Sequence, residues 1–352
     1  MVLNLFACAG VTELDVSLVD DGIKKDPIEF VAPEFRPSLS AQRKMVDAMG
    51  PRGFDNEMLA NIRQTGGSGR PVLLDEPKVT EHLVTGINGA PDVPVFIVGE
   101  KADSPRPAIL YIHGGGYILG DATTDLQRLQ SISQKHDAVI VSVEYRLAPE
   151  TPFPGPVEDS YAALKWMADN ADQLGIDTSR IAVMGESAGG GLAAMLTLMA
   201  RDRTEVDRAE VDIVQQILIY PMLDDRTGST KVMPYWMGAY SWNDVANRFG
   251  WSSLLGVPAG SKQVPAGSVP AREKDLRGLP PTFIAVGAVD LFVNEDIDYA
   301  QRLLASGVPT ELIVLPGGYH GFQVSNPKTV LANRFHDAVD AALKRTFKVE
   351  DI

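Results

Sequence analysis

Short apolar runs alternate with helical patterns along most of this 352-residue chain. Runs such as AILYI at 108–112 and AVIVSV at 138–143 are apolar almost without interruption, which is typical of strands covered on both faces. Strands that alternate with helices predict an α/β fold, with a mostly parallel sheet between two layers of helices. The eight candidate strands are His82–Ile87, Val93–Val98, Ala108–His113, Ala138–Glu144, Arg180–Met184, Ile213–Tyr220, Thr282–Val286 and Glu311–Leu315. The candidate helices are Thr124–His136, Val157–Asp172, Ser187–Arg201, Asn294–Ser306 and Asn326–Phe347.

The beginning of the chain departs from this alternation. Residues 1–75 are irregular and rich in Pro and Asp, with short helical candidates at Ser40–Met49 and Asp55–Gln64. The first two candidate strands are joined only by residues 88–92, NGAPD, so we expect an antiparallel hairpin at one edge of the sheet.

A long segment without candidate strands, residues 221–281, also interrupts the alternation. Its aromatic side chains either form the small core of a helical insertion or line an apolar ligand site. We expect a lid that does both. The candidate pocket residues are Tyr235, Trp236, Tyr240, Trp242 and Trp251.

Charge and cysteine content exclude several classes of partner and site. The chain carries 32 Lys and Arg against 46 Asp and Glu, a formal net charge of −14, and has no long basic run. Nucleic acids and anionic membrane surfaces both require clustered Lys and Arg, so neither is an expected partner. The single cysteine, Cys8, excludes an intrachain disulfide and a cysteine metal site.

The N-terminus, MVLNLFACAG, has no basic residue ahead of its short apolar run, so we expect a folded segment rather than an export signal. No stretch approaches the roughly 20 apolar residues needed to span a bilayer. We therefore expect a soluble, cytoplasmic protein.

The stretch VMGESAGGG at residues 183–191 joins the end of a candidate strand to the start of an Ala-rich helix. In that context G-x-S-x-G predicts a tight turn that lifts the Ser187 hydroxyl clear of the sheet, with glycines letting strand and helix approach. A serine needs a base to act as a nucleophile, and no His or Lys lies within the stretch. The base must therefore come from a distant part of the chain.

A second glycine-rich stretch, YIHGGGYILG at residues 111–120, also follows a candidate strand. A phosphate-binding loop is disfavoured, because this stretch has no Lys-Ser/Thr pair and no Walker-type pattern occurs in the chain. The amides of Gly114 and Gly115, together with that of Ala188, instead predict an oxyanion hole. His113 is expected to brace this loop rather than to act as the base.

A set of motifs occurs in the order known from one family: HGGG at 113–116, YRLAPE at 145–150, PVEDSYAAL at 156–164, GESAGGG at 185–191, GLPP at 278–281 and YHGF at 319–322. The chain resembles the hormone-sensitive-lipase-like, or family IV, bacterial esterases of the α/β-hydrolase fold. The match covers most of residues 80–345. It implies a serine esterase with a helical cap over its active site.

The resemblance also implies how the chain is divided. In that family the N-terminal segment and the insertion combine into the cap, which here gives residues 1–75 and 222–272. The catalytic α/β-hydrolase domain then comprises residues 76–221 and 273–352. A homodimer is compatible with the resemblance, although the residues mark no interface.

The family orders its catalytic residues along the chain as nucleophile, acid and base. Only His320 lies in a loop after the last candidate strand, in PGGYHGF, and its match to the YHGF motif assigns it as the base. The other histidines lie in an edge strand, in the oxyanion loop or in helices, and are His82, His113, His136 and His336.

Asp290 follows the candidate strand TFIAVG closely and matches the first Asp of the family's D-P-L-R-D-E element. It is therefore expected to orient His320. Asp296 is the alternative acid, although carboxylates at helix starts are usually caps or dipole partners. The element departs from the family pattern at Leu291, Val293 and Asn294.

Other charged residues of these motifs are expected to be structural. Arg146 and Glu150 of YRLAPE predict an ion pair, and Asp159 is expected to cap or brace the helix that follows. Glu186, beside the serine, would either tune the site or hydrogen-bond the loop, and the structural role is the one expected.

Together these features predict a carboxylic-ester hydrolase with a Ser187–His320–Asp290 triad, acting on a small-molecule ester and needing no metal or cofactor. The resemblance implies short- to medium-chain acyl esters. A lipase or an amidase would use the same machinery and is an alternative. A ligand-binding receptor is the rival from another class, since plant gibberellin receptors resemble this family but lack the catalytic histidine, which is present here.

Overall fold

The computed structural model describes residues 25–39, 43, 54–65, 71–100, 104–203 and 212–347. Nearly all of the predicted helix Ser40–Met49 lies outside these residues, and so does Cys8. Within them, each of the other predicted strands and helices is present, with boundaries that differ by a few residues.

Eight strands form one sheet in the order β1-β2-β4-β3-β5-β6-β7-β8. β1 pairs antiparallel with β2, β2 pairs antiparallel with β4, and the other neighbours are parallel. This confirms the predicted eight-stranded, mostly parallel sheet with an antiparallel hairpin at one edge. The strands are β1 (Val79–Val84), β2 (Val93–Val98), β3 (Arg106–Ile112), β4 (Val139–Val143), β5 (Ile176–Glu186), β6 (Ile213–Ile219), β7 (Thr282–Gly287) and β8 (Thr310–Leu315).

The edge hairpin begins earlier than predicted. β1 occupies residues 79–84 rather than 82–87, and the chain then turns through the short 3₁₀ helix η4 (Ile87–Gly89). The register pairs Val79 with Val98 and Val84 with Val93. β2 has six residues, and these pair with residues 79–84. Residues 85–87 therefore have no partner in β2, and Ile87 belongs to the turn.

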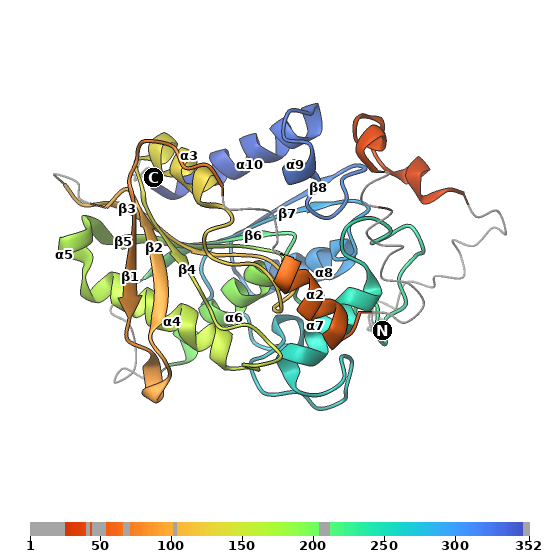
Figure 1. Ribbon diagram of the computed structural model, residues 1–352, viewed down its shortest axis with the longest axis horizontal. Helices are drawn as coiled ribbons and strands as arrows, with labels where there is room; N and C mark the ends of the chain where they lie inside the picture. Colours follow the sequence, from red (N-terminus) through yellow and green to blue (C-terminus); the bar gives the residue numbers. More distant parts are fainter. Residues whose placement is uncertain are drawn as a thin grey trace, which may run out of the picture.

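Helices cover both faces of the sheet (Figure 1). The alternation of β3 explains why its sequence is apolar throughout: Leu110 and Ile112 are buried in the core that contains α4 and α6, whereas Ile109 and Tyr111 are buried in the core that contains α3 and α10. The helices are α2 (Asn56–Thr65), α3 (Leu126–His136), α4 (Gly155–Asp169), α5 (Ala171–Leu174), α6 (Ala188–Asp202), α7 (Asp244–Leu255), α8 (Val293–Ala305), α9 (Phe322–Ser325) and α10 (Val330–Phe347).

Two segments that are far apart in the sequence meet beside the sheet, where α2 and α7 lie close together in Figure 1. Phe54, just before α2, packs on Phe249 of α7 with ring centroids 5.0 Å apart. The N-terminal segment and the insertion therefore share a contact. Their assignment as one cap, and the domain boundaries predicted above, stay a proposal.

Ion pairs of the YRLAPE motif differ from the prediction. Arg146 pairs with Asp159 through both of its carboxylate oxygens, at 2.7 and 2.8 Å, and Asp159 is buried in α4. Glu150 instead accepts a hydrogen bond from Arg63 of α2 at 2.7 Å. The predicted Arg146–Glu150 pair is wrong, because a buried carboxylate that faces the guanidinium competes better than an exposed one.

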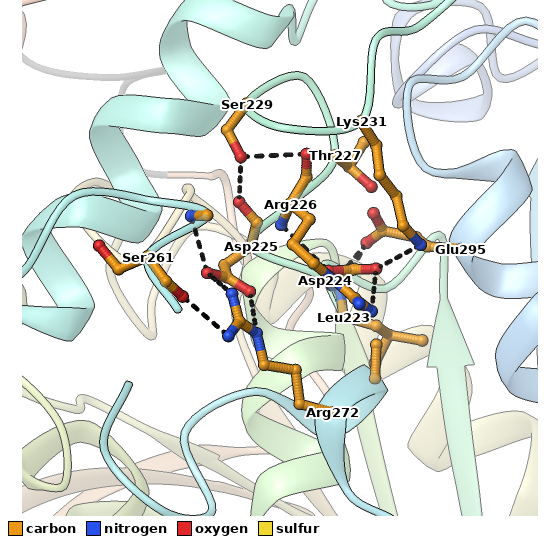
Figure 2. Close-up of polar contacts among 12 residues, drawn as sticks. Leu223, Asp224, Asp225, Arg226, Thr227, Ser229, Lys231, Ser261, Arg272 and Glu295 are labelled. Carbon is orange, nitrogen blue, oxygen red and sulfur yellow. Dashed lines mark hydrogen bonds and ion pairs between the residues drawn. The ribbon is translucent and has the colours of Figure 1, made fainter. Parts of the chain in front are cut away.

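A buried ion pair ties together the insertion between β6 and β7 (Figure 2). The Asp225 carboxylate has no exposed surface and accepts two hydrogen bonds from Arg272, each of 2.7 Å. The same carboxylate accepts a hydrogen bond from the Gly260 amide at 2.8 Å, and Arg272 also donates to the Ser261 carbonyl. The beginning, the middle and the end of the insertion thus converge on one carboxylate.

A second carboxylate links the insertion to the sheet's helices. Glu295, in the first turn of α8, accepts hydrogen bonds from the amides of Leu223 and Asp224 at 2.7 and 3.1 Å. Figure 2 shows this contact beside the Asp225–Arg272 pair. The start of the insertion is therefore held against α8, the helix that follows Asp290.

We expect Arg272→Met to lower the free energy of unfolding by about 3 kcal/mol, because it leaves the Asp225 carboxylate buried without its cation. Urea unfolding followed by circular dichroism measures the change. Arg277→Met is the matched control, since Arg277 pairs with Asp275 on an exposed surface and its removal should have no measurable effect. Equal losses in the two variants would contradict the special role of the buried pair.

Candidate active site

Ser187 stands alone between the end of β5 and the start of α6, in a sharp turn. Its backbone angles are φ 54° and ψ −120°, a conformation that non-glycine residues rarely adopt. The turn is held by three backbone hydrogen bonds: the Ser187 amide donates to Ile219, and its carbonyl accepts from Gly191 and Met222. The predicted tight turn is present.

Glycine is required where α6 crosses the end of β3. A Cβ built on Gly189 would lie 2.1 Å from the carbonyl oxygen of Ile112, which no side chain tolerates. The small residue therefore lets the helix start directly under the turn, and the Ser187 side chain projects from the carboxyl edge of the sheet.

The side chains of Ser187, His320 and Asp290 form a continuous hydrogen-bonded row. His320 Nε2 lies 3.0 Å from Ser187 Oγ, and its Nδ1–H donates to an Asp290 carboxylate oxygen at 2.8 Å. The other oxygen of Asp290 accepts from the Phe292 amide at 3.0 Å. The fold thus brings together three residues that were predicted from separate motifs. The serine and the histidine are 133 positions apart in the sequence.

The row is almost closed to solvent. Asp290 is fully buried, and Ser187 and His320 are 6% and 8% exposed. The imidazole is packed by two aromatic rings at steep angles, Tyr220 at a centroid distance of 4.7 Å and Phe292 at 5.2 Å. Low exposure and close packing restrict the imidazole to one orientation.

Asp296, the alternative acid, does not contact the histidine. It is buried in the first turn of α8, and neither of its oxygens has a hydrogen-bond partner among the described residues. Burial raises the pKa of Asp296 well above its usual range, and the negative charges of Glu295 and Asp290 raise it further. The structure therefore places Asp290, and not Asp296, beside His320.

The predicted oxyanion loop lies against the serine. A Cβ built on Gly114 would lie 3.4 Å from the Cβ of Ser187, and Ala188 is the residue that follows the serine. Gly115 has a φ of 126°, which favours glycine. Gly114 therefore lies beside the serine, Ala188 follows the serine directly in the chain, and Gly115 follows Gly114.

His113 packs inside the loop, as expected for a brace. Its Nδ1–H donates to the Gly114 carbonyl at 2.8 Å, and its ring stacks on Tyr145 at a centroid distance of 4.1 Å. Burial lowers the pKa of His113. The lowered pKa favours the neutral imidazole, which braces the loop. The imidazole makes no hydrogen bond to Ser187, His320 or Asp290 among the described residues.

The five predicted pocket residues of the insertion occupy different positions. Tyr235 and Trp236 lie on the N-terminal segment, where Trp236 stacks on Phe30 and the Tyr235 hydroxyl donates to the Lys25 carbonyl. Trp242 packs on the oxyanion loop, since a Cβ built on Gly116 would lie 2.2 Å from its ring.

The other two aromatic residues belong to the core. Tyr240 is buried beside Tyr319, the neighbour of His320. Trp251 has no exposed surface and packs on Tyr117 with ring centroids 5.0 Å apart. This corrects the expectation that Trp251 lines a pocket: its side chain is turned toward Tyr117 and the core, so packing buries it.

A cavity of about 590 Å³ lies between the insertion and the N-terminal segment. Tyr235 lines it, together with Leu291, which follows Asp290. The described residues that line this cavity do not include Ser187 or His320. Of the predicted pocket residues, Tyr235 borders this cavity and Trp242 borders the oxyanion loop.

Comparison with known proteins shows which family the chain belongs to. The sequence pattern of a family described as the alpha/beta hydrolase fold matches residues 109–324, which is more than half of the chain. The chain belongs to this family. The matched residues include the predicted oxyanion loop, the Ser187 turn, Asp290 and His320.

Several named relatives of this hydrolase are esterases. Carboxylesterase NlhH of Mycobacterium tuberculosis is 32% identical over 299 residues, which cover 82% of this chain and 89% of the relative. Esterase LipI of the same organism is 35% identical over 295 residues, which cover 79% and 86%. The solved structure of a bacterial heroin esterase has a TM-score of 0.73 at 31% identity and covers 92% of this chain and 100% of its own.

These likenesses confirm the resemblance to hormone-sensitive-lipase-like, family IV esterases and the α/β-hydrolase fold. This hydrolase is therefore a carboxylic-ester hydrolase. No helix in the described part of the chain is long and apolar enough to cross a membrane. The same residues include no group of His, Cys, Asp and Glu side chains arranged to hold a metal ion. The cytoplasmic location, the small-molecule partner and the homodimer stay predictions.

Sequence reasoning missed two residues near Ser187 and His320. Tyr220 directly follows β6 and packs on His320. Its position at the end of a strand that pairs with β5 could have marked it as a residue near Ser187. Arg128 of α3 pairs with Glu186, the neighbour of Ser187. No local pattern singles out this arginine, because its partner comes from a strand 58 residues away (186 − 128).

Proposed function

We propose that this esterase hydrolyses short- to medium-chain acyl esters through an acyl-enzyme formed on Ser187. Ser187 Oγ attacks the ester carbonyl carbon while His320 Nε2 takes the hydroxyl proton. Asp290 keeps the proton on Nδ1 and stabilises the imidazolium that forms. The histidine then gives its proton to the departing alcohol.

The oxyanion of the tetrahedral intermediate is assigned to the amides of Gly114, Gly115 and Ala188. The amide of Ala188 begins α6, where the first N–H groups have no partner within the helix and the helix dipole favours negative charge. In the second half of the reaction, water activated by His320 attacks the acyl-enzyme and releases the acid.

One observation carries this proposal, namely the hydrogen-bonded row from Ser187 Oγ through His320 to Asp290, at 3.0 and 2.8 Å. A serine becomes a nucleophile only with a base in reach, and the base needs a third group to fix its tautomer. The names of the relatives, carboxylesterase and esterase, support the same reaction on an ester.

We expect kcat/KM to be highest for p-nitrophenyl esters of short acyl chains and to fall about tenfold or more for the palmitate, because the nearly buried serine leaves little room for a long chain. An acyl-length series from acetate to palmitate measures this. An anilide of the best acid tests amidase activity. A kcat/KM that is highest for the palmitate would favour the lipase alternative. Turnover of the anilide at a rate comparable to that of the ester would favour the amidase alternative.

A further inference from the structure

A buried polar network lies directly behind the reacting serine and histidine. Glu186, which precedes Ser187 at the end of β5, is nearly fully buried. One of its carboxylate oxygens accepts a hydrogen bond from the Tyr220 hydroxyl at 2.9 Å, and the other pairs with Arg128 at 2.5 Å. A buried carboxylate beside the nucleophile is thus held from two sides.

Tyr220 connects the serine side of the site to the histidine side. Its ring packs against the His320 ring at a centroid distance of 4.7 Å. Its hydroxyl donates to Glu186 and accepts from the Gln323 amide at 2.5 Å, three residues after His320. The tyrosine therefore touches the imidazole, the residue before the nucleophile and the helix that follows the histidine.

Arg128 is fixed by its own contacts. It lies in α3 and donates to the Tyr111 hydroxyl at 2.9 Å, and it pairs with Asp125 at 3.4 Å. The Tyr111 hydroxyl in turn donates to Asp125 at 2.6 Å. Burial raises the pKa of Glu186, and the charge of Arg128 opposes that increase. Arg128 therefore holds the Glu186 carboxyl group by direct contact and offsets part of the cost of burying it beside the serine turn.

We propose that Arg128, Glu186 and Tyr220 are positioning residues that keep Ser187 and His320 within hydrogen-bond distance of each other. This inference rests on the proposed function, because it assigns Ser187 and His320 as the reacting pair. The network joins the strand end that carries Ser187, through Glu186, to the segment that carries His320, through Gln323, and Arg128 anchors it to α3. Loss of one link lets the imidazole or the serine turn shift, and a small misplacement of reacting groups lowers the rate steeply.

A cavity on the α3 side gives experimental access to this network. It has a volume of about 460 Å³ and is lined by Arg128, Asp125, Gln323 and His336, among others. The Arg128 side chain is 28% exposed. A small cation from solution can therefore enter the space that a shortened side chain at position 128 would leave.

Tyr220→Phe is the sharpest variant, because it keeps the ring against His320 and removes only the hydroxyl that joins Glu186 and Gln323. We expect kcat to fall about 10- to 100-fold with KM nearly unchanged, since the reacting groups are misplaced while the substrate pocket is not. Glu186→Gln should behave in the same way. Steady-state kinetics with p-nitrophenyl butyrate and thermal unfolding are measured for each variant.

Arg128→Ala should also lower kcat, and millimolar guanidinium chloride should restore part of it, whereas equal sodium chloride should not. The matched control is Arg180→Ala, which removes an arginine paired with Asp177 at the opposite end of β5. The control should keep wild-type kcat and show no response to guanidinium.

Folded variants with wild-type kcat, or with a raised KM and unchanged kcat, would overturn the positioning role. Arg128→Ala that loses kcat but responds equally to both salts would overturn the part assigned to the guanidinium. If Arg128→Ala does not fold, Tyr220→Phe still decides the proposal. Failure of the proposed function would show differently, as turnover retained by Ser187→Ala.

Discussion

Replacing Ser187 with alanine is expected to lower kcat by about 10⁶-fold, the loss seen when a serine nucleophile of this kind is removed. The remaining activity would come from the oxyanion hole and substrate binding alone. The fold should survive, because alanine occupies the same backbone conformation and the three hydrogen bonds of the turn come from the main chain. Stopped assays with p-nitrophenyl butyrate and thermal unfolding of the same sample measure both.

Two further measurements make this expectation specific. A serine-directed phosphonate should label the wild-type enzyme, and peptide mapping should find the label on Ser187. The double variant Ser187→Ala/His320→Ala should be no slower than either single variant, because the two residues act as one unit. Near-wild-type turnover in folded Ser187→Ala, or a label on another residue, would contradict the assigned nucleophile.

Asp290→Asn is expected to lower kcat by about 10⁴-fold, because an amide cannot hold the proton on His320 Nδ1 and favours the wrong tautomer. The hydrogen bond of 2.8 Å between these two side chains is the contact that changes. Since an asparagine has the same shape, substrate binding should change little. Steady-state kinetics at several pH values measure kcat and KM separately.

Asp296→Asn is the matched control for this carboxylate. Asp296 lies six residues further on (296 − 290) and is fully buried, and its oxygens have no hydrogen-bond partner among the described residues. Burial raises its pKa, which shifts the carboxyl group toward its uncharged form. Its replacement by a neutral amide should leave kcat nearly unchanged. An inactive Asp296 variant together with an unaffected Asp290 variant would exchange the two roles.

Much of the fold and of the site could be predicted because both are encoded locally. The uninterrupted apolar runs of β3 and β4 reflect strands buried on both faces, and the structure has them there. The turn at Ser187 follows from glycines between a strand and a helix. His320 is separated from the other histidines by its loop after the last strand and by its YHGF motif.

Side-chain partners were harder to predict. Arg146 selects Asp159 rather than Glu150, and Trp251 packs in the core rather than lining a pocket. Arg128 reaches Glu186 from another layer of the fold. In each case the partner is set by which faces meet after packing, and a sequence window contains no information on that.

The sequence by itself determined the order of strands and helices, the turn at Ser187 and the residue types able to carry out acyl transfer, because hydrophobic period and glycine spacing act within a few residues. Only the tertiary structure decided which carboxylate faces His320 and which aromatic residues of the insertion are buried. It also decided that Arg128 pairs with Glu186, the residue before the serine. Those contacts join residues that are dozens to more than a hundred positions apart. They exist only once the parallel strands bring their carboxyl ends to one edge of the sheet and the helices close over it.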